Sequence, residues 1–546
     1  MTEHDGSGPD RVLSEHGGLS VAASAAIADA IKAVSVEAAQ AEVARRLAAK
    51  DPTLWGPDAE PEASIRLGWP DLPRTSRELL PQLAELRQSL QADGLDHVVL
   101  AGMGGSSLAP EVITRTAGVE LTVLDTTDPG QVRAAIEDRL SRTVVVVSSK
   151  SGGTVETDSH RRAYAKAFRD AGVSEERVGQ RFVAVTDPGS PLEQTGKDEG
   201  FRAVVLADPN VGGRYSALTA FGLVPSALAG VDVAALLDEA GAVAGALGFA
   251  ENNPALDLGL ALAAAYRVGR DKLVLADAGS GIVGLGDWVE QLVAESTGKN
   301  GRGLLPVVVE SPTTAGTSGD DVALVTVGGG GLDRAVASVS GPLGAQFLAW
   351  EYATAVVGWA IGINPFDQPN VQESKDNTRR ILTAGLPATT PAFTEGTVQV
   401  YGDPGLLGGV ATVTEALRAL LAAIGDRGYL AVMAYLDRQA DATAADLRGM
   451  LARSTPHAVT FGWGPRFLHS TGQYHKGGPQ VGAFLQLTGA VGDDLPVPGQ
   501  PYTFGVLQAA QAAGDAEALA GRGRPFVRLH LTDRAAGLGQ LLEAAP

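Results

Sequence analysis

The hydrophobic pattern of the chain alternates between two spacings. Short runs of consecutive apolar residues, rich in β-branched side chains, are separated by longer stretches in which apolar residues recur at helical spacing. The short runs are typical of parallel strands buried on both faces, and the alternation is the pattern of a doubly wound α/β domain. The first set of predicted strands is His97–Ala101, Leu121–Asp125, Val144–Ser148, Phe182–Thr186 and Ala203–Leu206.

The pattern recurs twice more. A second set of strands is predicted at Lys272–Ala276, Leu305–Val309 and Val322–Val327, and a third follows the Pro- and Thr-rich stretch Thr383–Pro391 as VQVY, YLAVMAYL, HAVTFGW, VGAFLQL and FVRLHL. Before the first set, residues 19–50 and 76–92 have helical spacing. We therefore predict an N-terminal helical segment (1–90), two doubly wound parallel-sheet domains (91–235 and 236–385) and a C-terminal α/β region (386–546).

Two segments bear on the compartment. The most apolar stretch, Gly341–Ile363, contains Gln346, Glu351 and Tyr352, so we expect a buried helix rather than a transmembrane one. The N-terminal residues are acidic and polar and lack an apolar core, so no secretory signal is expected. Both observations favour a cytoplasmic protein.

Composition excludes several classes of function. With 43 Lys and Arg against 63 Asp and Glu, the net charge is -20, which disfavours binding to nucleic acid or anionic membranes. The absence of cysteine excludes disulfides, thiolate metal sites and cysteine nucleophiles, and it agrees with a reducing cytosol. The histidines are scattered, so neither a metal nor another cofactor is expected.

Two polar loops follow predicted strands of the first α/β domain. Gly102–Ser107 (GMGGSS) follows one strand, and Ser148–Thr157 (SSKSGGTVET) follows another. Glycine-rich turns that open a helix, with hydroxyls and a lysine, suit a phosphate group. Each loop alone could be a capping turn, but two at the carboxyl ends of parallel strands predict one shared crevice.

Three further segments carry charged residues in unusual settings. Arg214 follows two glycines in Val211–Ser216, which suits a fixed charge beside a developing oxyanion. In Glu290–Lys299, Gln291 and Glu295 share a helix face, and Glu295 lies near the helix end, where a carboxylate does not favour the helix. Glu295 is thus a candidate general base, or alternatively a solvated glutamate. The third segment, Asn364–Lys375, links two helices through Pro365 and Pro369.

These segments, in this order, resemble the phosphoglucose isomerase family of the sugar-isomerase fold. The motifs are GMGGSSLAP, SSKSGGTVET, VGGRYS, ESTGK, and PLGAQFLAWEY running into NPFDQPNVQESK, within about residues 91–380. The nearest subtype is the isomerase half of bifunctional transaldolase/phosphoglucose isomerase proteins, although the chain has no room for a transaldolase barrel. The resemblance implies two sugar-isomerase domains and reversible conversion of D-glucose 6-phosphate into D-fructose 6-phosphate through a cis-enediolate.

The resemblance also implies a role for each site residue. It implies that Arg214 stabilises the enediolate, Glu295 is the catalytic base, Gln291 and Gln368 bind substrate and Lys375 assists ring opening. The sugar-phosphate clamp would comprise Gly105, Ser106, Ser149, Lys150, Ser151 and Thr154.

One departure concerns the catalytic histidine, which in the family lies between the base and the lysine. No histidine lies between Glu295 and Lys375 here, and the matching pattern, LHSTGQYHKGG, occurs at residues 468–478. His469 is therefore the predicted catalytic histidine, with His475 as its rival; a core or loop role for His469 is the alternative. In the family this histidine comes from the partner subunit, which implies a homodimer and leaves open which subunit supplies it here.

Other functions stay open to different degrees. A non-catalytic sugar-phosphate-binding regulator would not need Glu295, Arg214 and Lys375 together. A hexosamine synthase of the amidotransferase type needs a cysteine nucleophile, which is absent. A dual glucose/mannose phosphate isomerase is compatible with the sequence.

Overall fold

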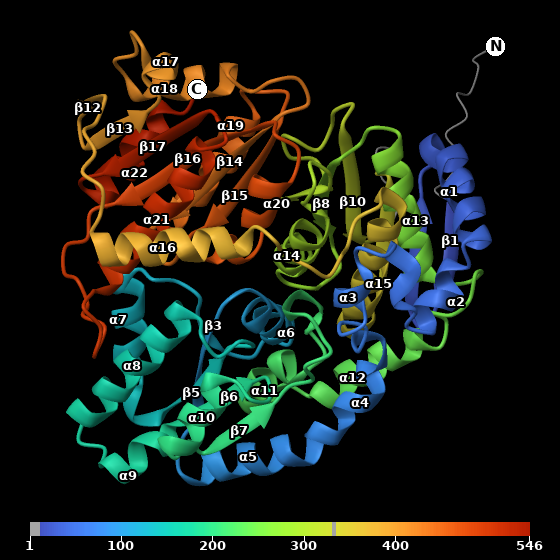
Figure 1. The fold of residues 1–546 in the computed structure, drawn as a ribbon, viewed down its shortest axis with the longest axis horizontal. Helices are drawn as coiled ribbons and strands as arrows, with labels where there is room; N and C mark the ends of the chain where they lie inside the picture. Colours follow the sequence, from blue (N-terminus) through green and yellow to red (C-terminus); the bar gives the residue numbers. More distant parts are fainter. Residues whose placement is uncertain (1–10, 330–334) are drawn as a thin grey trace.

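Three β-sheets with packed helices form the molecule (Figure 1). The structure is a computed structural model and describes residues 11–329 and 335–546. The first ten residues, which contribute to the expectation of no secretory signal, lie outside the described residues. The predicted mixture of parallel sheets and helices is confirmed.

The first sheet is fully parallel and has the strand order β4-β3-β5-β6-β7. Each strand coincides with a predicted apolar run, because β-branched residues buried on both faces favour central parallel strands. The strands are β3 (His97–Gly102), β4 (Thr122–Leu124), β5 (Thr143–Ser148), β6 (Phe182–Thr186) and β7 (Ala203–Leu206). The chain passes from β3 to β4 on one side and then crosses back to β5 on the other side of β3, so the switch point of the sheet lies between β3 and β5.

The second sheet corrects the expectation of a purely helical N-terminal segment. Its order is β1-β2-β11-β10-β8-β9, and the antiparallel hairpin β1–β2 pairs with the edge strand β11. The second strand of the hairpin runs directly into an Ala-rich stretch, so local spacing favours a helix from Leu19 onwards; pairing with a distant strand decides its conformation. The strands are β1 (Arg11–His16), β2 (Leu19–Ala23), β8 (Lys272–Ala278), β9 (Leu305–Val309), β10 (Val322–Gly328) and β11 (Ala337–Ser340).

The third sheet belongs to the C-terminal region and has the order β12-β13-β17-β16-β14-β15. Strands β14 to β17 are parallel, whereas β12 and β13 form an antiparallel edge. The five predicted runs all form strands. The strands are β12 (Phe393–Glu395), β13 (Val398–Gly402), β14 (Tyr429–Tyr435), β15 (Ala458–Trp463), β16 (Gly482–Gly489) and β17 (Phe526–Leu531).

Helices connect and cover these sheets. Those before and around the first sheet are α1 (Ala28–Gln40), α2 (Val43–Ala48), α3 (Glu60–Ala63), α4 (Leu72–Thr75), α5 (Leu80–Ala92), α6 (Leu108–Thr116), α7 (Pro129–Glu137), α8 (Val155–Asp170), α9 (Glu175–Val178), α10 (Pro191–Asp198) and α11 (Ala220–Ala229). The remainder are α12 (Val233–Ala244), α13 (Pro254–Arg267), α14 (Leu285–Thr297), α15 (Leu343–Ile361), α16 (Val371–Ala384), α17 (Pro404–Leu407), α18 (Val413–Ala422), α19 (Asp446–Ala452), α20 (Gly472–Gly477), α21 (Phe504–Ala520) and α22 (Arg534–Ala544).

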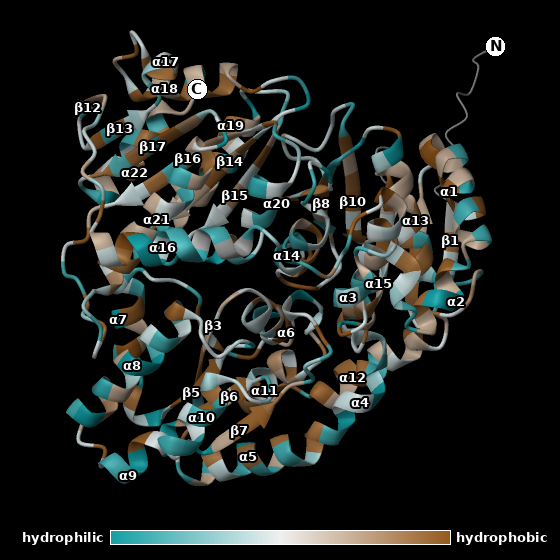
Figure 2. Ribbon diagram, viewed as in Figure 1, coloured by the Kyte–Doolittle hydropathy of each residue, from teal (hydrophilic) through white to brown (hydrophobic). Residues whose placement is uncertain are grey.

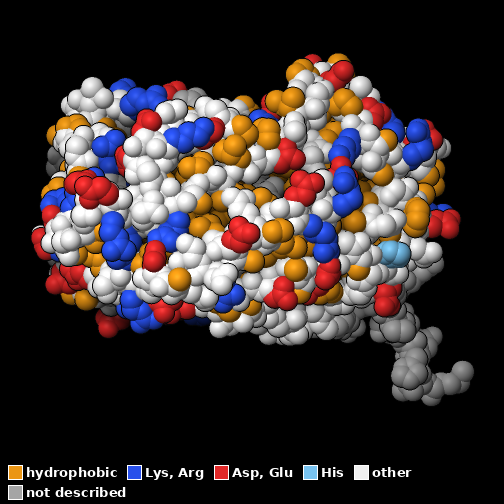
Figure 3. Space-filling model, turned by 90° about the horizontal axis from the view of Figure 1, so that it is seen from below, with side chains coloured by type: hydrophobic (Ala, Val, Ile, Leu, Met, Phe, Trp, Pro, Cys, Tyr) orange, Lys and Arg blue, Asp and Glu red, His pale blue; other side chains and the backbone are white. Residues whose placement is uncertain are grey.

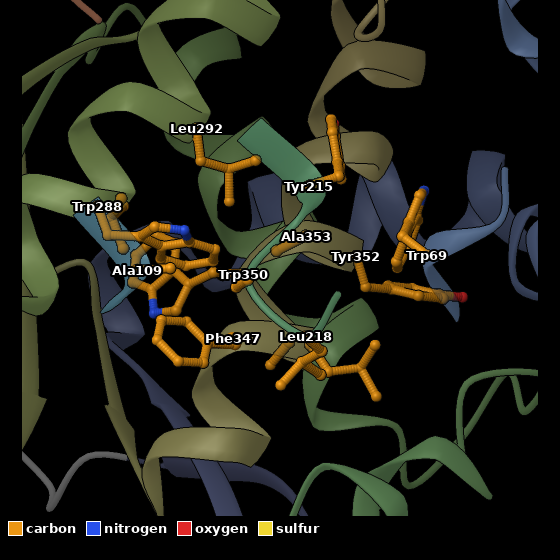
Figure 4. Close-up of a cluster of buried hydrophobic side chains, with 14 of the residues drawn as sticks. Trp69, Ala109, Tyr215, Leu218, Trp288, Leu292, Phe347, Trp350, Tyr352 and Ala353 are labelled. Atoms are coloured by element: carbon orange, nitrogen blue, oxygen red, sulfur yellow. The ribbon is translucent and has the colours of Figure 1, made fainter. Parts of the chain in front are cut away.

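The largest hydrophobic core joins the first two sheets through α15. Trp350 of this helix packs beside Trp288 and Phe347, and Tyr352 lies against Trp69 (Figure 4). Helix α15 is therefore buried, as predicted for Gly341–Ile363. None of the helices within the described residues meets both the length and the hydropathy that a bilayer crossing requires.

Hydropathy follows the layers of the fold. The strands are mostly brown and the exposed sides of helices such as α8 and α16 are largely teal (Figure 2). On the face shown in Figure 3, acidic and basic side chains are interspersed, as in an ordinary solvated surface.

Candidate active site

The two glycine-rich loops flank the switch point of the first sheet. In the loop after β3, Gly104 has a positive φ of 56°, and a Cβ there would lie 2.6 Å from Nε2 of Gln291. A Cβ at Gly105 would lie 1.9 Å from the carbonyl oxygen of Gly213. Glycine is therefore required at both positions, because three segments distant in sequence meet there at backbone contact.

The loop after β5 forms a cluster of hydroxyl groups. Oγ of Ser149 lies 2.8 Å from Oγ1 of Thr154 and accepts a hydrogen bond from the Gly152 N–H. Ser106 lies buried in the neighbouring loop after β3, and Ser151 is exposed. These donors suit the phosphate of a sugar phosphate.

Lys150 is the member of the predicted clamp that the structure sets apart. Its ammonium pairs with Asp187, at the end of β6. The charge of Lys150 is thus already partnered, so the neutral hydroxyls are better placed than Lys150 to hold a phosphate.

Arg214 is buried, and its guanidinium is held from three directions. Nε donates to Oγ of Ser296 at 2.8 Å, and Nη1 donates to Oε1 of Gln368 at 2.7 Å. Nη1 also lies 3.4 Å from Oε2 of Glu295, and Nη2 donates to the main-chain oxygens of Pro365 and Asp367. A fixed, desolvated cation beside a carboxylate is the arrangement expected for stabilising a developing oxyanion.

Glu295 lies in the last turn of α14, where its side chain is 7% exposed. Burial raises the pKa of Glu295 above its ordinary value, and the charges of Arg214, His469 and Lys299 oppose that rise. Glu295 therefore combines burial with a pKa shifted towards neutrality, which suits a group that takes and returns a proton.

Lys299 is a buried cation near this pair. It donates to the main-chain oxygens of Asn364 and Asp367. Burial, together with the charge of Arg214, lowers the pKa of Lys299 to about 7.

His469 lies beside α14 within the same chain. Its main-chain oxygen accepts a 2.9 Å hydrogen bond from Nε2 of Gln291, one turn before Glu295 on α14. Its imidazole Nε2 lies 3.1 Å from Oε1 of Glu156. Burial opposes ionisation of Glu156, but the hydrogen bond and charge of His469 lower the pKa of Glu156 below its ordinary value. An anionic Glu156 therefore orients the imidazole of His469.

A cavity of about 550 Å³ opens beside His469. Thr154, Glu156 and Lys375 share its wall with His469, and Lys375 itself is exposed on α16. The structure thus places Thr154 of the predicted clamp, His469 and Lys375 on one cavity, whereas Arg214, Glu295 and the other clamp residues are not among the described residues that line it. The size suits a small phosphorylated ligand.

His475, the rival histidine, lies elsewhere. It is buried among Tyr429, Phe467 and Phe484, and neither ring nitrogen has a hydrogen-bond partner within the described chain. Burial lowers the pKa of His475 well below its ordinary value. His475 is therefore a neutral core residue, and the geometry favours His469.

Three further residues of this region had no functional prediction from the sequence. Glu156 resembles an ordinary acidic residue in the first turn of a helix. Gln511 bridges Glu156 and Thr127 from α21, at 2.7 and 2.8 Å. Lys299 belongs to the ESTGK motif, but the sequence alone does not show that it is buried or that it contacts the loop that carries Gln368.

The chain is similar in sequence to known phosphoglucose isomerases. The sequence model of the family described as phosphoglucose isomerase matches residues 87–300, which include both glycine-rich loops, Arg214 and Glu295. A glucose-6-phosphate isomerase from Rubrobacter xylanophilus is 30% identical over 391 residues, which cover 56% of this chain and 87% of the relative. The chain belongs to the phosphoglucose isomerase family.

Two further comparisons define how far this phosphoglucose isomerase match extends. A glucose-6-phosphate isomerase from Cyanothece is 35% identical over 217 residues, and the match spans only 40% of that relative. A crystal structure of a glucose-6-phosphate isomerase from Chlamydia trachomatis shares the fold, with a TM-score of 0.55 at 18% identity over 68% of this chain and 90% of that one. The segment that contains His469 lies outside the residues matched by the family model.

Proposed function

We propose that this protein interconverts D-glucose 6-phosphate and D-fructose 6-phosphate through a cis-enediolate. The observation that carries the proposal is the buried pair of Arg214 and Glu295, 3.4 Å apart, with side chains only 2% and 7% exposed. An aldose–ketose isomerase needs a base that moves a proton between adjacent carbons and a cation beside the oxygen that becomes negative. Membership of the phosphoglucose isomerase family supports the choice of substrate.

In the proposed mechanism the hydroxyl cluster of Ser149 and Thr154 holds the phosphate. Ring opening requires a proton to reach the ring oxygen and another to leave the anomeric hydroxyl. His469 and Lys375 share the cavity wall and are the candidates for these two transfers. The hydrogen bond with Glu156 leaves Nδ1 of His469 as the ring nitrogen that can exchange a proton with the sugar.

Isomerisation of the open chain follows. Glu295 removes the proton from carbon 2 and returns it to carbon 1, while a proton passes between the two oxygens. Arg214 stabilises the negative charge of the enediolate between these steps. Each positioned acid or base contributes about 10²–10⁴-fold to the rate, and a fixed donor at an oxyanion about 10²–10³-fold.

A binding-only regulator is the alternative that the site supports least. Such a protein would need the hydroxyl loops, but it would have no use for a carboxyl whose pKa is raised by burial beside a buried arginine. The protein could also act on mannose 6-phosphate, which differs from glucose 6-phosphate only in the orientation of the hydroxyl group on carbon 2. Parallel assays on both sugar phosphates distinguish a single-substrate enzyme from a dual one.

We also propose that the enzyme acts in the cytoplasm as a homodimer, without metal and without nucleic-acid or membrane partners. The absence of cysteine and the net charge of -20 support these points. Light scattering coupled to gel filtration measures the oligomeric state.

Turnover should not depend on a divalent metal. Purified protein is expected to interconvert the two sugar phosphates at the same rate before and after dialysis against EDTA, because the proposed steps use only side-chain acids, bases and charges. A coupled assay of fructose 6-phosphate consumption measures this. Loss of activity with EDTA that returns on addition of a metal would contradict the metal-free mechanism.

Removing a hydroxyl group from the cluster of Ser149 and Thr154 should affect mainly substrate binding. Ser149→Ala or Thr154→Ala removes a hydrogen bond to a charged phosphate, worth about 1.5–3 kcal/mol, which corresponds to roughly a ten- to hundred-fold rise in KM. Steady-state kinetics and inhibition by a non-reacting sugar phosphate measure the effect. Ser151→Ala, at the exposed position of the same loop, is the matched control and should change KM less. A loss in kcat alone would place the phosphate elsewhere.

A further inference from the structure

A row of polar side chains crosses the C-terminal sheet outside the cavity that His469 lines. In the strand register, Gln399 pairs with His530, His530 with Thr488, and Thr488 with Tyr435. Residues directly opposite one another on neighbouring strands project to the same face of a sheet. The four side chains therefore form one row across β13, β17, β16 and β14, near the carboxyl ends of the parallel strands.

This row forms one wall of a second cavity, of about 230 Å³. Helix α21 forms the opposite wall and contributes Gln508, and Leu386 and Pro387 from the segment after α16 lie at its border. Ligands of parallel α/β sheets bind at the carboxyl ends of the strands, which is where this cavity lies. Its volume suits a molecule smaller than most drug-like ligands.

Several buried polar atoms in the cavity wall lack partners. Tyr435 is 1% exposed and Gln508 is 4% exposed, yet Oη of the tyrosine and Nε2 of the glutamine have no hydrogen-bond partner within the described chain. Nε of Arg528 is likewise a buried atom without a hydrogen-bond partner within the described chain. Buried donors of folded proteins are almost always satisfied, so three unpaired groups around one cavity indicate that something polar occupies it.

The wall is cationic and its polar groups are held in place. The guanidinium of Arg528 lies 4.0 Å from the ring centroid of Tyr401, whose hydroxyl donates to Gln399 at 2.8 Å. Nδ1 of His530 lies 3.0 Å from Oγ1 of Thr488, and burial lowers the pKa of His530. The described residues that line the cavity include no carboxylate, so the charge of Arg528 is not neutralised within it. The apolar part of the lining comes from Leu386, Pro387, Val491 and the alanines of α21.

We propose that this cavity is a second ligand site, which binds a small organic anion with a short apolar body. The carboxylate or phosphate of the ligand accepts hydrogen bonds from Arg528, Tyr435 and Gln508, and its body packs against Val491 and Ala509. The site is independent of the proposed isomerase activity, because none of the residues assigned to the isomerase reaction lines it.

The test measures binding of defined probes by isothermal titration calorimetry. Benzoate and phenyl phosphate present the two anionic groups on the same flat body, and benzamide is the neutral counterpart of benzoate. We expect saturable binding of at least one anion and binding of benzamide about ten-fold weaker or less. The stronger of the two anions identifies whether the site prefers carboxylate or phosphate.

Three variants locate the binding. Arg528→Gln should weaken binding of the anion by about ten-fold or more, and Tyr435→Phe should weaken it by several-fold, because each substitution removes a hydrogen-bond donor. Tyr429→Phe is the matched control: it removes another buried, unpartnered hydroxyl from the same strand, outside the cavity, and should leave binding unchanged. Thermal unfolding verifies that each variant is folded.

Two results would overturn the proposal. Binding with equal affinity to all three variants would place the anion elsewhere, including the phosphate clamp of the isomerase site. Failure of both anions to bind the native protein at about 10 mM would mean that water alone fills the cavity.

Discussion

Glu295→Gln is expected to lower kcat by about 10²-fold or more with little change in KM. The amide preserves the size of the side chain and its contact with Arg214, but it cannot take a proton from carbon 2. Steady-state assays in both directions measure the loss, which should be equal in the two directions because one base serves both.

The control for this variant is Glu351→Gln. Glu351 is a fully buried carboxyl on α15, whose oxygens have no side-chain hydrogen-bond partner in the described chain, and burial raises its pKa well above the ordinary value. The same substitution there should leave kcat within about three-fold, because Glu351 has no role in the proposed reaction. Near-normal turnover of Glu295→Gln would show that another carboxylate is the base.

The pH profile of the native protein gives an independent measure of Glu295. A base must be ionised, so kcat/KM should fall as the pH drops through the pKa of Glu295 in the free protein. Because burial raises that pKa, the acid limb should lie above the ordinary glutamate value of 4.5. An acid limb below 4.5 would contradict the assignment.

His469→Ala should slow the isomerisation of cyclic glucose 6-phosphate by about 10²–10⁴-fold, the usual contribution of a positioned acid or base. An open-chain substrate analogue should be affected far less, because it bypasses ring opening. Comparison of the two rates separates loss of the proton donor from a general disturbance of the site.

Mixing experiments test which subunit supplies the histidine. Here His469 contacts Gln291 and Glu156 of its own chain. Equimolar mixtures of His469→Ala and Glu295→Gln protomers, allowed to exchange subunits, should therefore show no more activity than the sum of the two. Recovery of up to about a quarter of native activity, since half of the dimers would be hybrids with one intact site of two, would show that the histidine acts on the partner's glutamate instead.

Much of the fold follows from local sequence. The apolar, β-branched runs such as Val144–Ser148 predict their strands because a buried parallel strand must be apolar on both faces. The hairpin of β1 and β2 could not be predicted in this way, since Leu19–Ala23 runs directly into an Ala-rich helical stretch and its pairing partner, β11, lies more than 300 residues away.

The site shows the same division. Glycines mark the loop after β3 because only glycine permits the close approaches at Gly104 and Gly105. The pairing of His469 with Glu156 spans 313 residues, and the contact of Gln511 with Glu156 spans 355. No local pattern encodes such contacts, so the orientation of the histidine emerges only when the C-terminal region is packed against the first sheet.

Because of that packing, activity requires the C-terminal region to be associated with the rest of the chain. The exposed segment Gly385–Thr390 separates a fragment with Glu295 and Arg214 from one with His469. If the chain were cut there, neither fragment would hold a full set of reacting groups. Turnover would then rise with fragment concentration by mass action, and its midpoint would give the affinity between the two parts. The protein would behave as a split enzyme, whose rate of turnover reports how tightly its two parts bind each other rather than how much substrate is present.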